Sequence, residues 1–208
     1  MRYIGCKTKL LEVLDKEINN FCGGVKNKKL CDLFAGTGCI GDFFQDRCEI
    51  TANDNLYFSY ILNRGKLLKN KVKFERLGFD PFAYFNEENY ENFTNGFCYK
   101  FFAPHESGRQ YFSDQNAKKI DFIRNKIEEW LNKGLINDIE HDYLLACLLE
   151  SVSKISNVAG VYAAYLHIWD SRAIKEMELI KEIIESSVDI KKNITNKHKK
   201  KLFHNSLF

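Results

Sequence analysis

The chain has 208 residues, 45% of them hydrophobic and 14% aromatic, which is enough for a substantial core in one domain or in one domain with an added lobe. No apolar run approaches the ~20 residues that a membrane-spanning helix requires, and charges interrupt residues 1–7 before any signal-peptide core. These features argue against a membrane-spanning protein and predict a cytoplasmic one.

The net charge is only +3, but residues 191–201 are locally basic. Such a run suits either a nucleic-acid partner or a solvated face. The cysteines are odd in number and never form the closely spaced pairs of a zinc site, so we expect no metal and reduced, mostly buried thiols. They are Cys6, Cys22, Cys31, Cys39, Cys48, Cys98 and Cys147.

The first third of the chain alternates helices and strands. A helix follows Thr8 and ends at Gly23–Gly24, and residues 29–41 form a short strand, a glycine loop and the start of a second helix. A second strand over residues 48–52 ends at Asn53–Asp54, and a helix is expected over residues 55–69. This order is the beginning of a doubly wound parallel sheet.

The centre of the chain reads differently. Aromatic residues alternate with polar ones from Asp80 to His105, which indicates a lobe and not a sheet core, and Asp80–Pro81 is interpreted as a turn. Helical periodicity returns over residues 116–133 and 138–156. The elements expected after these are a last amphipathic helix, capped by Asp170 or Ser171 and carrying Ile174, Met177, Leu179, Ile180 and Ile183, and a third strand at Leu202–Phe208.

The glycine loop indicates a cofactor site. Gly36, Gly38 and Gly41 let the backbone turn sharply and approach a ligand, while Asp32 ends one strand and Asp54 ends the next. An acid at the end of the second strand, as at Asp54, is suited to accept hydrogen bonds from ribose hydroxyls. The glycines also fall at the offsets of the dinucleotide fingerprint, so a nicotinamide cofactor stays open, as does a tight turn without a ligand.

Three segments make the pattern more specific. Tyr3–Lys7, Asp32–Gly38 and Asn53–Asp54 occur in the order that is typical of the Dam-like DNA adenine methyltransferases, which the chain resembles. Gly108–Ser113 and Ser156–Leu166 are similar to the central region of the subgroup found in type II restriction-modification systems. The resemblance implies methyl transfer from S-adenosylmethionine to the exocyclic amino group of adenine in double-stranded DNA. It also implies a Rossmann-like α/β fold with an inserted, mainly helical target-recognition lobe.

Carried over position by position, the resemblance implies that Asp54 holds the ribose and that the loop glycines admit the methionine moiety. Two departures are visible: Cys6 stands where a second glycine is usual, and Tyr3 stands where a tryptophan is common. The implied cofactor-binding residues are Tyr3, Lys7, Asp32, Phe34, Gly36, Gly38 and Asp54. From the residues alone, a core tyrosine and a surface lysine would be favoured at the first two positions.

The lobe would then recognise DNA. Arg109 suits a guanine edge or a phosphate, and the two asparagines suit a base edge or a helix cap. The tyrosines suit support of an extruded base, and packing is an equally good interpretation for each position. The candidate DNA-binding residues are Arg109, Tyr111, Asn116, Asn157, Tyr162 and Tyr165.

The catalytic motif of the family, Asp or Asn followed by Pro-Pro and an aromatic residue, does not occur in these 208 residues. The expectation is therefore an incomplete sheet in a truncated or split enzyme, inactive until a complementary fragment supplies the motif, and no catalytic residue is assigned. The expected domains are residues 1–79 for the cofactor, 80–170 for target recognition and 171–208 for the return to the sheet. A non-catalytic binding relic and a nicotinamide oxidoreductase are the alternatives.

Overall fold

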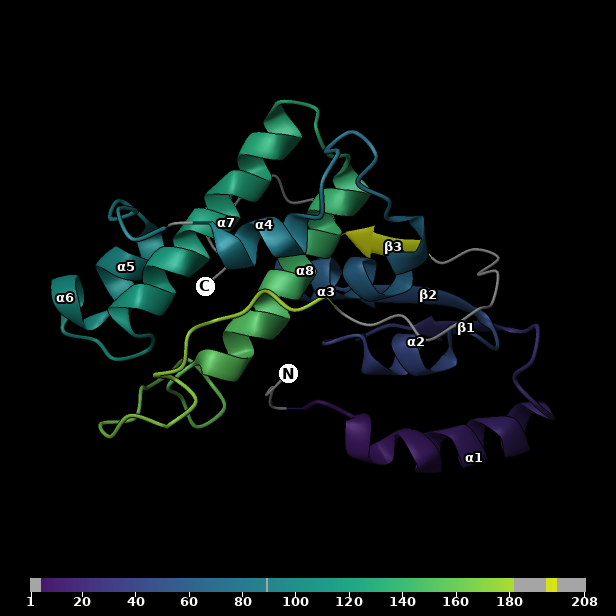
Figure 1. The fold of residues 1–208 in the computed structure, drawn as a ribbon. Coiled ribbons are helices and arrows are strands. Elements are labelled where there is room, and N and C mark those ends of the chain that lie inside the picture. Colours follow the sequence, from purple (N-terminus) through teal and green to yellow (C-terminus); the bar gives the residue numbers. More distant parts are fainter. Residues whose placement is uncertain (1–4, 89, 182–193, 198–208) are drawn as a thin grey trace. The chain divides into compact units, whose positions relative to one another are not determined.

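The computed structural model describes residues 5–88, 90–181 and 194–197, as a mostly helical α/β protein with a small parallel sheet (Figure 1). The chain forms two compact units, which we treat separately. The sheet unit comprises residues 5–72 and 194–197, and the helical unit comprises residues 73–181. The division by function into residues 1–79, 80–170 and 171–208 stays a prediction.

The sheet unit has three parallel strands in the order β1-β2-β3. The strands are β1 (Lys29–Asp32), β2 (Glu49–Asp54) and β3 (Ile194–Lys197). The helices are η1 (Thr8–Leu10), α1 (Leu11–Cys22), α2 (Cys39–Phe44), α3 (Tyr57–Leu67) and η2 (Lys69–Lys71). The strand next to β2 is thus Ile194–Lys197, eight residues before the expected start at Leu202, and the segment Leu202–Phe208 lies outside the described residues.

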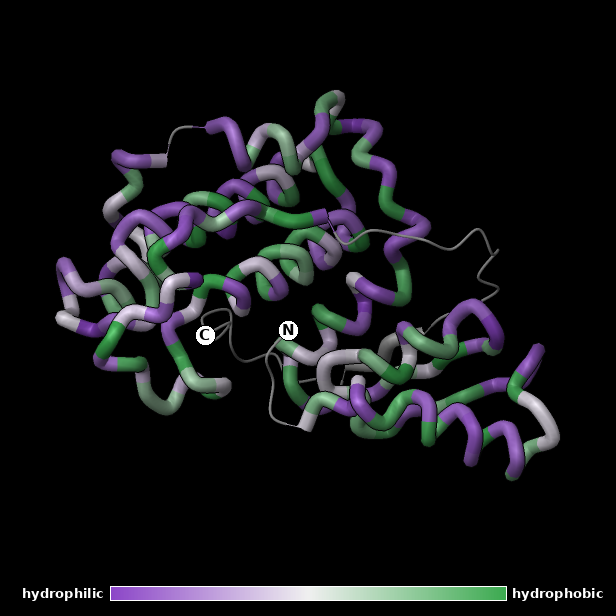
Figure 2. The backbone as a smooth tube through the Cα atoms, turned by 60° about the horizontal axis from the view of Figure 1, so that its bottom comes forward, coloured by the Kyte–Doolittle hydropathy of each residue, from purple (hydrophilic) through white to green (hydrophobic). Residues whose placement is uncertain are grey.

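Helix α1 ends where the sequence predicts. Gly23 adopts a left-handed conformation with φ 65°, and the amide of Gly24 donates to the carbonyl oxygen of Asn19 at 3.0 Å. Hydrophobic and hydrophilic residues alternate along the helix (Figure 2). One face points to the core through Ile18, while Phe21 is 95% exposed.

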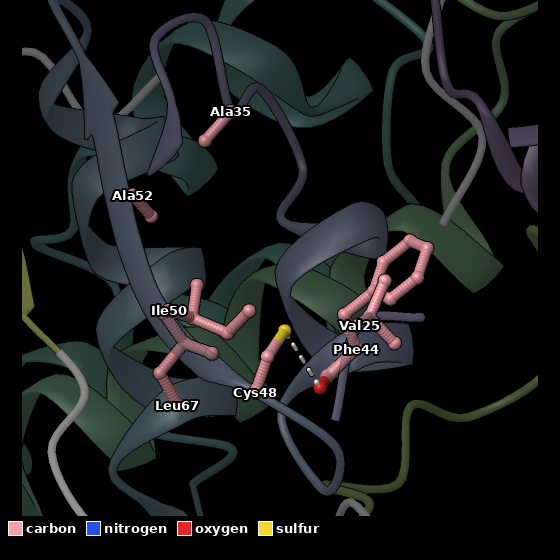
Figure 3. Close-up of a cluster of buried hydrophobic side chains, with 7 residues drawn as sticks. All are labelled: Val25, Ala35, Phe44, Cys48, Ile50, Ala52 and Leu67. Atoms are coloured by element: carbon pink, nitrogen blue, oxygen red, sulfur yellow. Dashed lines mark hydrogen bonds between the residues drawn. The ribbon is translucent and has the colours of Figure 1, made fainter. Parts of the chain in front are cut away.

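The core of the sheet unit lies between β2 and its flanking helices. Ile50 and Ala52 lie on the same face of β2 and belong to one buried cluster with Phe44 of α2 and Leu67 of α3, in which Ile50 lies beside Leu67 (Figure 3). The Cys48 thiol donates to the carbonyl oxygen of Phe44 at 3.5 Å. The full cluster is Val25, Ala35, Phe44, Cys48, Ile50, Ala52 and Leu67. This packing fixes the turn from β1 into α2, where the glycine loop lies.

The helical unit contains α4 (Pro81–Glu87), α5 (Phe97–Phe102), α6 (Pro104–Ser107), α7 (Asp114–Asn132) and α8 (Asp138–Ile155). The two long helices confirm the elements expected over residues 116–133 and 138–156. Ser113 caps α7 by accepting a hydrogen bond from the amide of Asn116, and Asn137 and Glu140 form a capping box at the start of α8.

The interpretation of Asp80–Pro81 as a turn was wrong. Asp80 is the N-cap of α4, and its carboxylate accepts the amide N–H of Phe82 at 3.0 Å. Pro81 occupies the first helical position, where its missing N–H costs nothing. The dipeptide is therefore a helix start.

The amphipathic helix expected after Asp170 was also wrong, because residues 171–181 run without helix. The side chain of Asn116 on α7 binds the backbone of this segment at three positions. Its amide nitrogen donates to the carbonyl oxygens of Ala173 and Lys175, at 3.2 and 2.8 Å, and its oxygen accepts the amide N–H of Met177 at 2.8 Å. These contacts use the backbone groups that a helix would have needed. Ile183 lies outside the described residues.

The cysteines are free, as expected, but only Cys48, Cys98 and Cys147 are buried, so the prediction of mostly buried thiols was wrong. Cys31 is exposed on β1, and the others are half-buried. Within the described residues, no helix combines the length and apolar character needed to cross a bilayer.

A buried histidine links the two long helices of the helical unit. The Nδ1 atom of His141 lies 3.0 Å from a carboxylate oxygen of Asp142, and its Nε2 atom lies 3.2 Å from one of Glu128. Burial alone would lower the pKa of His141, but the two carboxylates raise it from 6.5 to about 9. A raised pKa means that the folded state binds the proton more tightly than the unfolded state.

The stabilisation from His141 should therefore be complete below pH 6.5 and vanish as the pH rises through about 9. Between about pH 6 and about pH 10 we expect the wild type to lose about 3 kcal/mol more unfolding free energy than a His141→Gln variant does. Urea denaturation of both proteins at each pH measures the difference. Parallel pH profiles would contradict the ion-pair assignment.

Candidate active site

The glycine loop lies between the end of β1 and the start of α2. Gly36 and Gly38 have φ values of 52° and 76°, which glycine adopts without strain. A Cβ atom at Gly38 would lie 2.8 Å from the side-chain oxygen of Asn63 on α3. The loop therefore needs glycine at position 38 for both conformation and space.

Asp54 at the end of β2 ties this loop to the sheet. Its carboxylate accepts the amide N–H of Gly36 at 2.8 Å and the amide N–H of Leu56 at 2.9 Å. The amide of Ala35 also donates to the carbonyl oxygen of Asn53 at 3.0 Å. The glycine loop after β1 and the acid at the end of β2 are thus in direct contact, and the role of Asp54 in holding a ribose stays a prediction.

Asp32 at the end of β1 brings a second carboxylate to the same edge. One of its oxygens accepts the amide N–H of Phe34 at 3.3 Å, and the other is buried without a hydrogen-bond partner among the described residues. The pKa of Asp32 is raised overall, mainly because the carboxyl group is buried, and the nearby charge of Asp54 adds to this effect. The hydrogen bond from the Phe34 N–H and the positive charge of Lys7 oppose it. A buried oxygen without a partner is an acceptor suited to an ammonium or hydroxyl group of a ligand.

Apolar surface adjoins these carboxylates. Phe34 is 82% exposed and Leu33 60%, and Leu56 after β2 is 54% exposed. Lys7 is exposed, with its Nζ atom 3.5 Å from the carbonyl oxygen of Gly5, and Tyr3 lies outside the described residues. Two acids, a tight glycine loop and exposed apolar side chains fit an adenosine-type cofactor that carries a positive charge.

Two residues that support the loop were missed by sequence reasoning. The Asn63 amide nitrogen donates to the carbonyl oxygen of Gly36 at 3.1 Å, and the Lys66 ammonium donates to that of Thr37 at 3.0 Å. Both are buried on α3. With buried Ser59 they form a buried polar stripe at helical spacing along α3, and that spacing is the signal that would have found them.

In the helical unit, Asn157 joins the two central segments that the sequence singles out. Its backbone amide donates to the carbonyl oxygen of Tyr111 at 2.9 Å, and its side-chain nitrogen donates to those of Gln110 and Leu166 at 3.0 and 2.8 Å. The Tyr111 ring stacks on Tyr162 at 6.2 Å and meets the ring of Tyr165 edge-on at 5.2 Å. The candidate tyrosines therefore form one aromatic cluster, which we call the tyrosine cluster.

The remaining candidates differ in accessibility. Arg109 is exposed, and one guanidinium nitrogen donates to the carbonyl oxygen of Phe101 at 3.3 Å. Asn116 and Asn157 are 1% and 0% exposed, and backbone groups already occupy both amides. This placement favours the packing interpretation for the two asparagines and leaves Arg109 as the accessible polar candidate.

Comparisons with known proteins identify one family of similar sequences. Residues 3–205 match the family model described as D12 class N6 adenine-specific DNA methyltransferase. The chain is 38% identical over 198 residues to "Modification methylase LlaI" of Lactococcus lactis subsp. lactis. The aligned region covers 93% of the chain and 31% of the relative. It is 38% identical over 187 residues to "Type II methyltransferase M.FokI" of Planomicrobium okeanokoites, covering 86% and 28%.

A further relative is "Type II methyltransferase M.NlaIII" of Neisseria lactamica, 38% identical over 198 residues, covering 91% of the chain and 56% of the relative. The chain thus spans between about a quarter and just over half of the length of these proteins. No solved structure matches the chain.

Proposed function

The chain belongs to the D12 class of N6 adenine-specific DNA methyltransferases, and on that premise we propose that its sheet unit binds S-adenosylmethionine and that its helical unit recognises double-stranded DNA. The observation that carries the proposal is the pair of carboxylates at the glycine loop. Asp54 is bound to the loop backbone, and Asp32 has a buried oxygen without a partner among the described residues.

In this proposal each residue has a binding or orienting role. Asp54 accepts hydrogen bonds from the ribose hydroxyls, and its contact with the Gly36 amide holds the loop in place while it does so. Asp32 accepts from the ammonium group of the methionine moiety, and Lys7 and Tyr3 line the pocket. Phe34 supplies an apolar contact. When bound, S-adenosylmethionine supplies a methyl group on a positively charged sulfur.

We further propose that methyl transfer requires the Asp-Pro-Pro-aromatic motif, which these 208 residues do not contain. In that motif the side-chain oxygen and a backbone carbonyl accept hydrogen bonds from the adenine amino group and orient its nitrogen, and the aromatic ring stacks on the flipped base. The chain would then contribute the methyl donor and part of the DNA contact, and another polypeptide segment would contribute catalysis.

Isothermal titration calorimetry with S-adenosylmethionine and with NAD tests the cofactor proposal. We expect binding of S-adenosylmethionine and none of NAD at the same concentrations. Binding of NAD in preference to S-adenosylmethionine would support the nicotinamide alternative. The spacing of the glycines at positions 36, 38 and 41 is compatible with that alternative.

Reconstitution tests the division of labour. Labelled S-adenosylmethionine and genomic DNA are incubated with the chain, with a segment from a relative that carries the motif, and with both. Label should enter adenine only when both are present. Label from the chain alone would contradict the proposal, and inactivity of the mixture despite cofactor binding would favour a non-catalytic relic.

Arg109 offers a test of DNA recognition. If its guanidinium contacts a guanine edge, Arg109→Ala should weaken binding of the preferred duplex by about 1 to 3 kcal/mol and relax specificity at one base pair. Selection from a randomised duplex pool, with wild type and variant side by side, measures both effects. Equal weakening on all sequences would identify a phosphate contact instead. Lys100→Ala on α5 is the matched control for loss of one exposed charge.

A further inference from the structure

The glycine loop contains a tight turn whose two ends are hydrogen-bonded to each other. The amide N–H of Gly38 donates to the carbonyl oxygen of Ala35 at 2.8 Å, so Gly36 and Thr37 are the central residues of the turn. The peptide group between these two residues takes no part in that hydrogen bond. Turns with the same closing hydrogen bond differ mainly in the direction in which this central peptide group points. Another contact must therefore set its orientation.

Asn63 of α3 supplies this contact. Its side-chain nitrogen donates to the carbonyl oxygen of Gly36 at 3.1 Å and to that of Ser59, one turn earlier on α3, at 2.8 Å. Its side-chain oxygen fills the place where a side chain at Gly38 would begin. The residue is only 2% exposed. One buried amide thus binds the central peptide group of the turn and also packs against the glycine that ends it.

Lys66 of α3 binds the next carbonyl group of the loop. Its ammonium group donates to the carbonyl oxygen of Thr37 at 3.0 Å, and the residue is only 7% exposed. The carbonyl oxygens of Gly36 and Thr37 are therefore both directed towards α3. Because the C=O and N–H groups of a trans peptide point in opposite directions, the N–H of Thr37 is directed away from α3.

We propose that Asn63 and Lys66 are positioning residues for the ligand of the glycine loop: they select the one orientation of the peptide groups on either side of Thr37 that admits the amino-acid end of S-adenosylmethionine. This role rests on the proposed cofactor function, in which Asp54 binds the ribose and the loop glycines admit the methionine moiety. Both side chains act through the loop backbone and not by contact with the ligand.

The loop needs such residues because glycine gives its backbone many conformations. Without the contacts from α3, the turn around Gly36 and Gly38 would populate several orientations of its peptide groups. A ligand that fits one orientation then binds more weakly, in proportion to the fraction of molecules in that state. The loss of one hydrogen bond from α3 is expected to lower this fraction, and with it the affinity, by about tenfold.

Calorimetry with two ligands tests the positioning role. S-adenosylmethionine carries the amino-acid end, whereas 5′-methylthioadenosine has the same adenosine with a methylthio group and lacks that end. Asn63→Leu and Lys66→Met should weaken binding of S-adenosylmethionine by about tenfold and change binding of 5′-methylthioadenosine by less than about twofold. Asn70→Leu and Lys71→Met, at exposed positions of η2, are matched controls and should bind both ligands as the wild type does.

The choice of ligands separates positioning from a general structural role. Equal losses for the two ligands in folded variants would overturn the proposal, because a damaged sheet unit binds the adenosine end and the amino-acid end equally badly. Lys66→Arg keeps a cationic donor and should retain most of the affinity for S-adenosylmethionine. Circular dichroism shows whether each variant is folded. If Asn63→Leu is not, Asn63→Ser, which leaves room for water, must show the same ligand selectivity.

Amide hydrogen exchange tests the same role without a ligand. In Asn63→Leu and Lys66→Met, exchange within residues 34–40 should become about tenfold faster, while residues 49–54 of β2 should exchange as in the wild type. Unchanged exchange at residues 34–40 would overturn the proposal. Equally faster exchange along β2 would also overturn it, because the two side chains would then stabilise the whole sheet unit and not the loop.

The two proposals fail in distinguishable ways. If the wild type binds no S-adenosylmethionine, the cofactor proposal fails, and hydrogen exchange still decides whether Asn63 and Lys66 fix the loop. If the wild type and the folded variants bind S-adenosylmethionine equally well, the cofactor proposal stands and the positioning role is wrong.

Discussion

Asp54→Ala is expected to weaken S-adenosylmethionine binding by about 100-fold. The carboxylate accepts the amides of Gly36 and Leu56, at 2.8 and 2.9 Å, and in our proposal it also accepts the ribose hydroxyls. Hydrogen bonds to a charged group contribute about 1.5 to 3 kcal/mol each, and every 1.4 kcal/mol is about tenfold in affinity. Losing the ribose contact and the support of the loop together gives the expected factor, measured by calorimetry.

Two further variants separate binding from folding. Asp54→Asn keeps one acceptor oxygen and should lose less affinity than alanine does. Asp46→Ala removes an exposed carboxylate from the turn between α2 and β2 and should bind as the wild type does. Circular dichroism shows whether each protein is folded. A folded Asp54→Ala variant with unchanged affinity would remove Asp54 from the cofactor site.

The part of the fold that the sequence predicts best is the part that local signals determine. The strand, glycine loop and helix over residues 29–44 follow from a short apolar run and glycines at positions that need positive φ. The contact of Asp54 with Gly36 spans 18 residues, yet it was predictable because the carboxyl ends of parallel strands meet at one edge.

Residues 171–181 show why other parts were not predictable. The spacing of their apolar residues suits a helix, but side chains from three helices distant in the sequence form hydrogen bonds with their backbone groups. Besides Asn116 of α7, Asn86 of α4 exchanges two hydrogen bonds with the backbone of Leu179, at 2.8 and 3.1 Å, and the hydroxyl of Ser151 accepts the amide of Ile180 at 3.0 Å. Tertiary hydrogen bonds thus override local propensity, and a single sequence does not reveal such partners.

The same limit applies to the candidate site. Asn157 occurs in a polar segment that resembles a recognition motif. Sequence alone does not distinguish a side-chain amide that contacts a DNA base from one that hydrogen-bonds two loops to each other. In the structure its oxygen accepts the amide N–H of Asp170 at 3.0 Å and its nitrogen holds two carbonyl oxygens. The asparagine joins the segments that carry Tyr111 and Tyr165, so its contribution to the tyrosine cluster is structural.

Asp121→Ala is expected to lower the free energy of unfolding by about 3 to 5 kcal/mol, because buried donors left without an acceptor cost about 1 to 3 kcal/mol each. Asp121 on α7 is 3% exposed, and its carboxylate accepts the amides of Cys98 and Tyr99, at 2.9 and 2.8 Å, in the first turn of α5. Urea denaturation measures the loss. Asp138→Ala, at an exposed first-turn aspartate of α8, is the control and should change stability far less.

Gly96→Ala provides an independent approach to the same contact. A Cβ atom at Gly96 would overlap the Asp121 carboxyl group, so the carboxylate must move away from the amides that it accepts. Because both substitutions remove the same two hydrogen bonds, Gly96→Ala combined with Asp121→Ala should cost clearly less than the sum of the single variants. Additive losses would show that Asp121 and the start of α5 stabilise the helical unit independently, contrary to the contact between them.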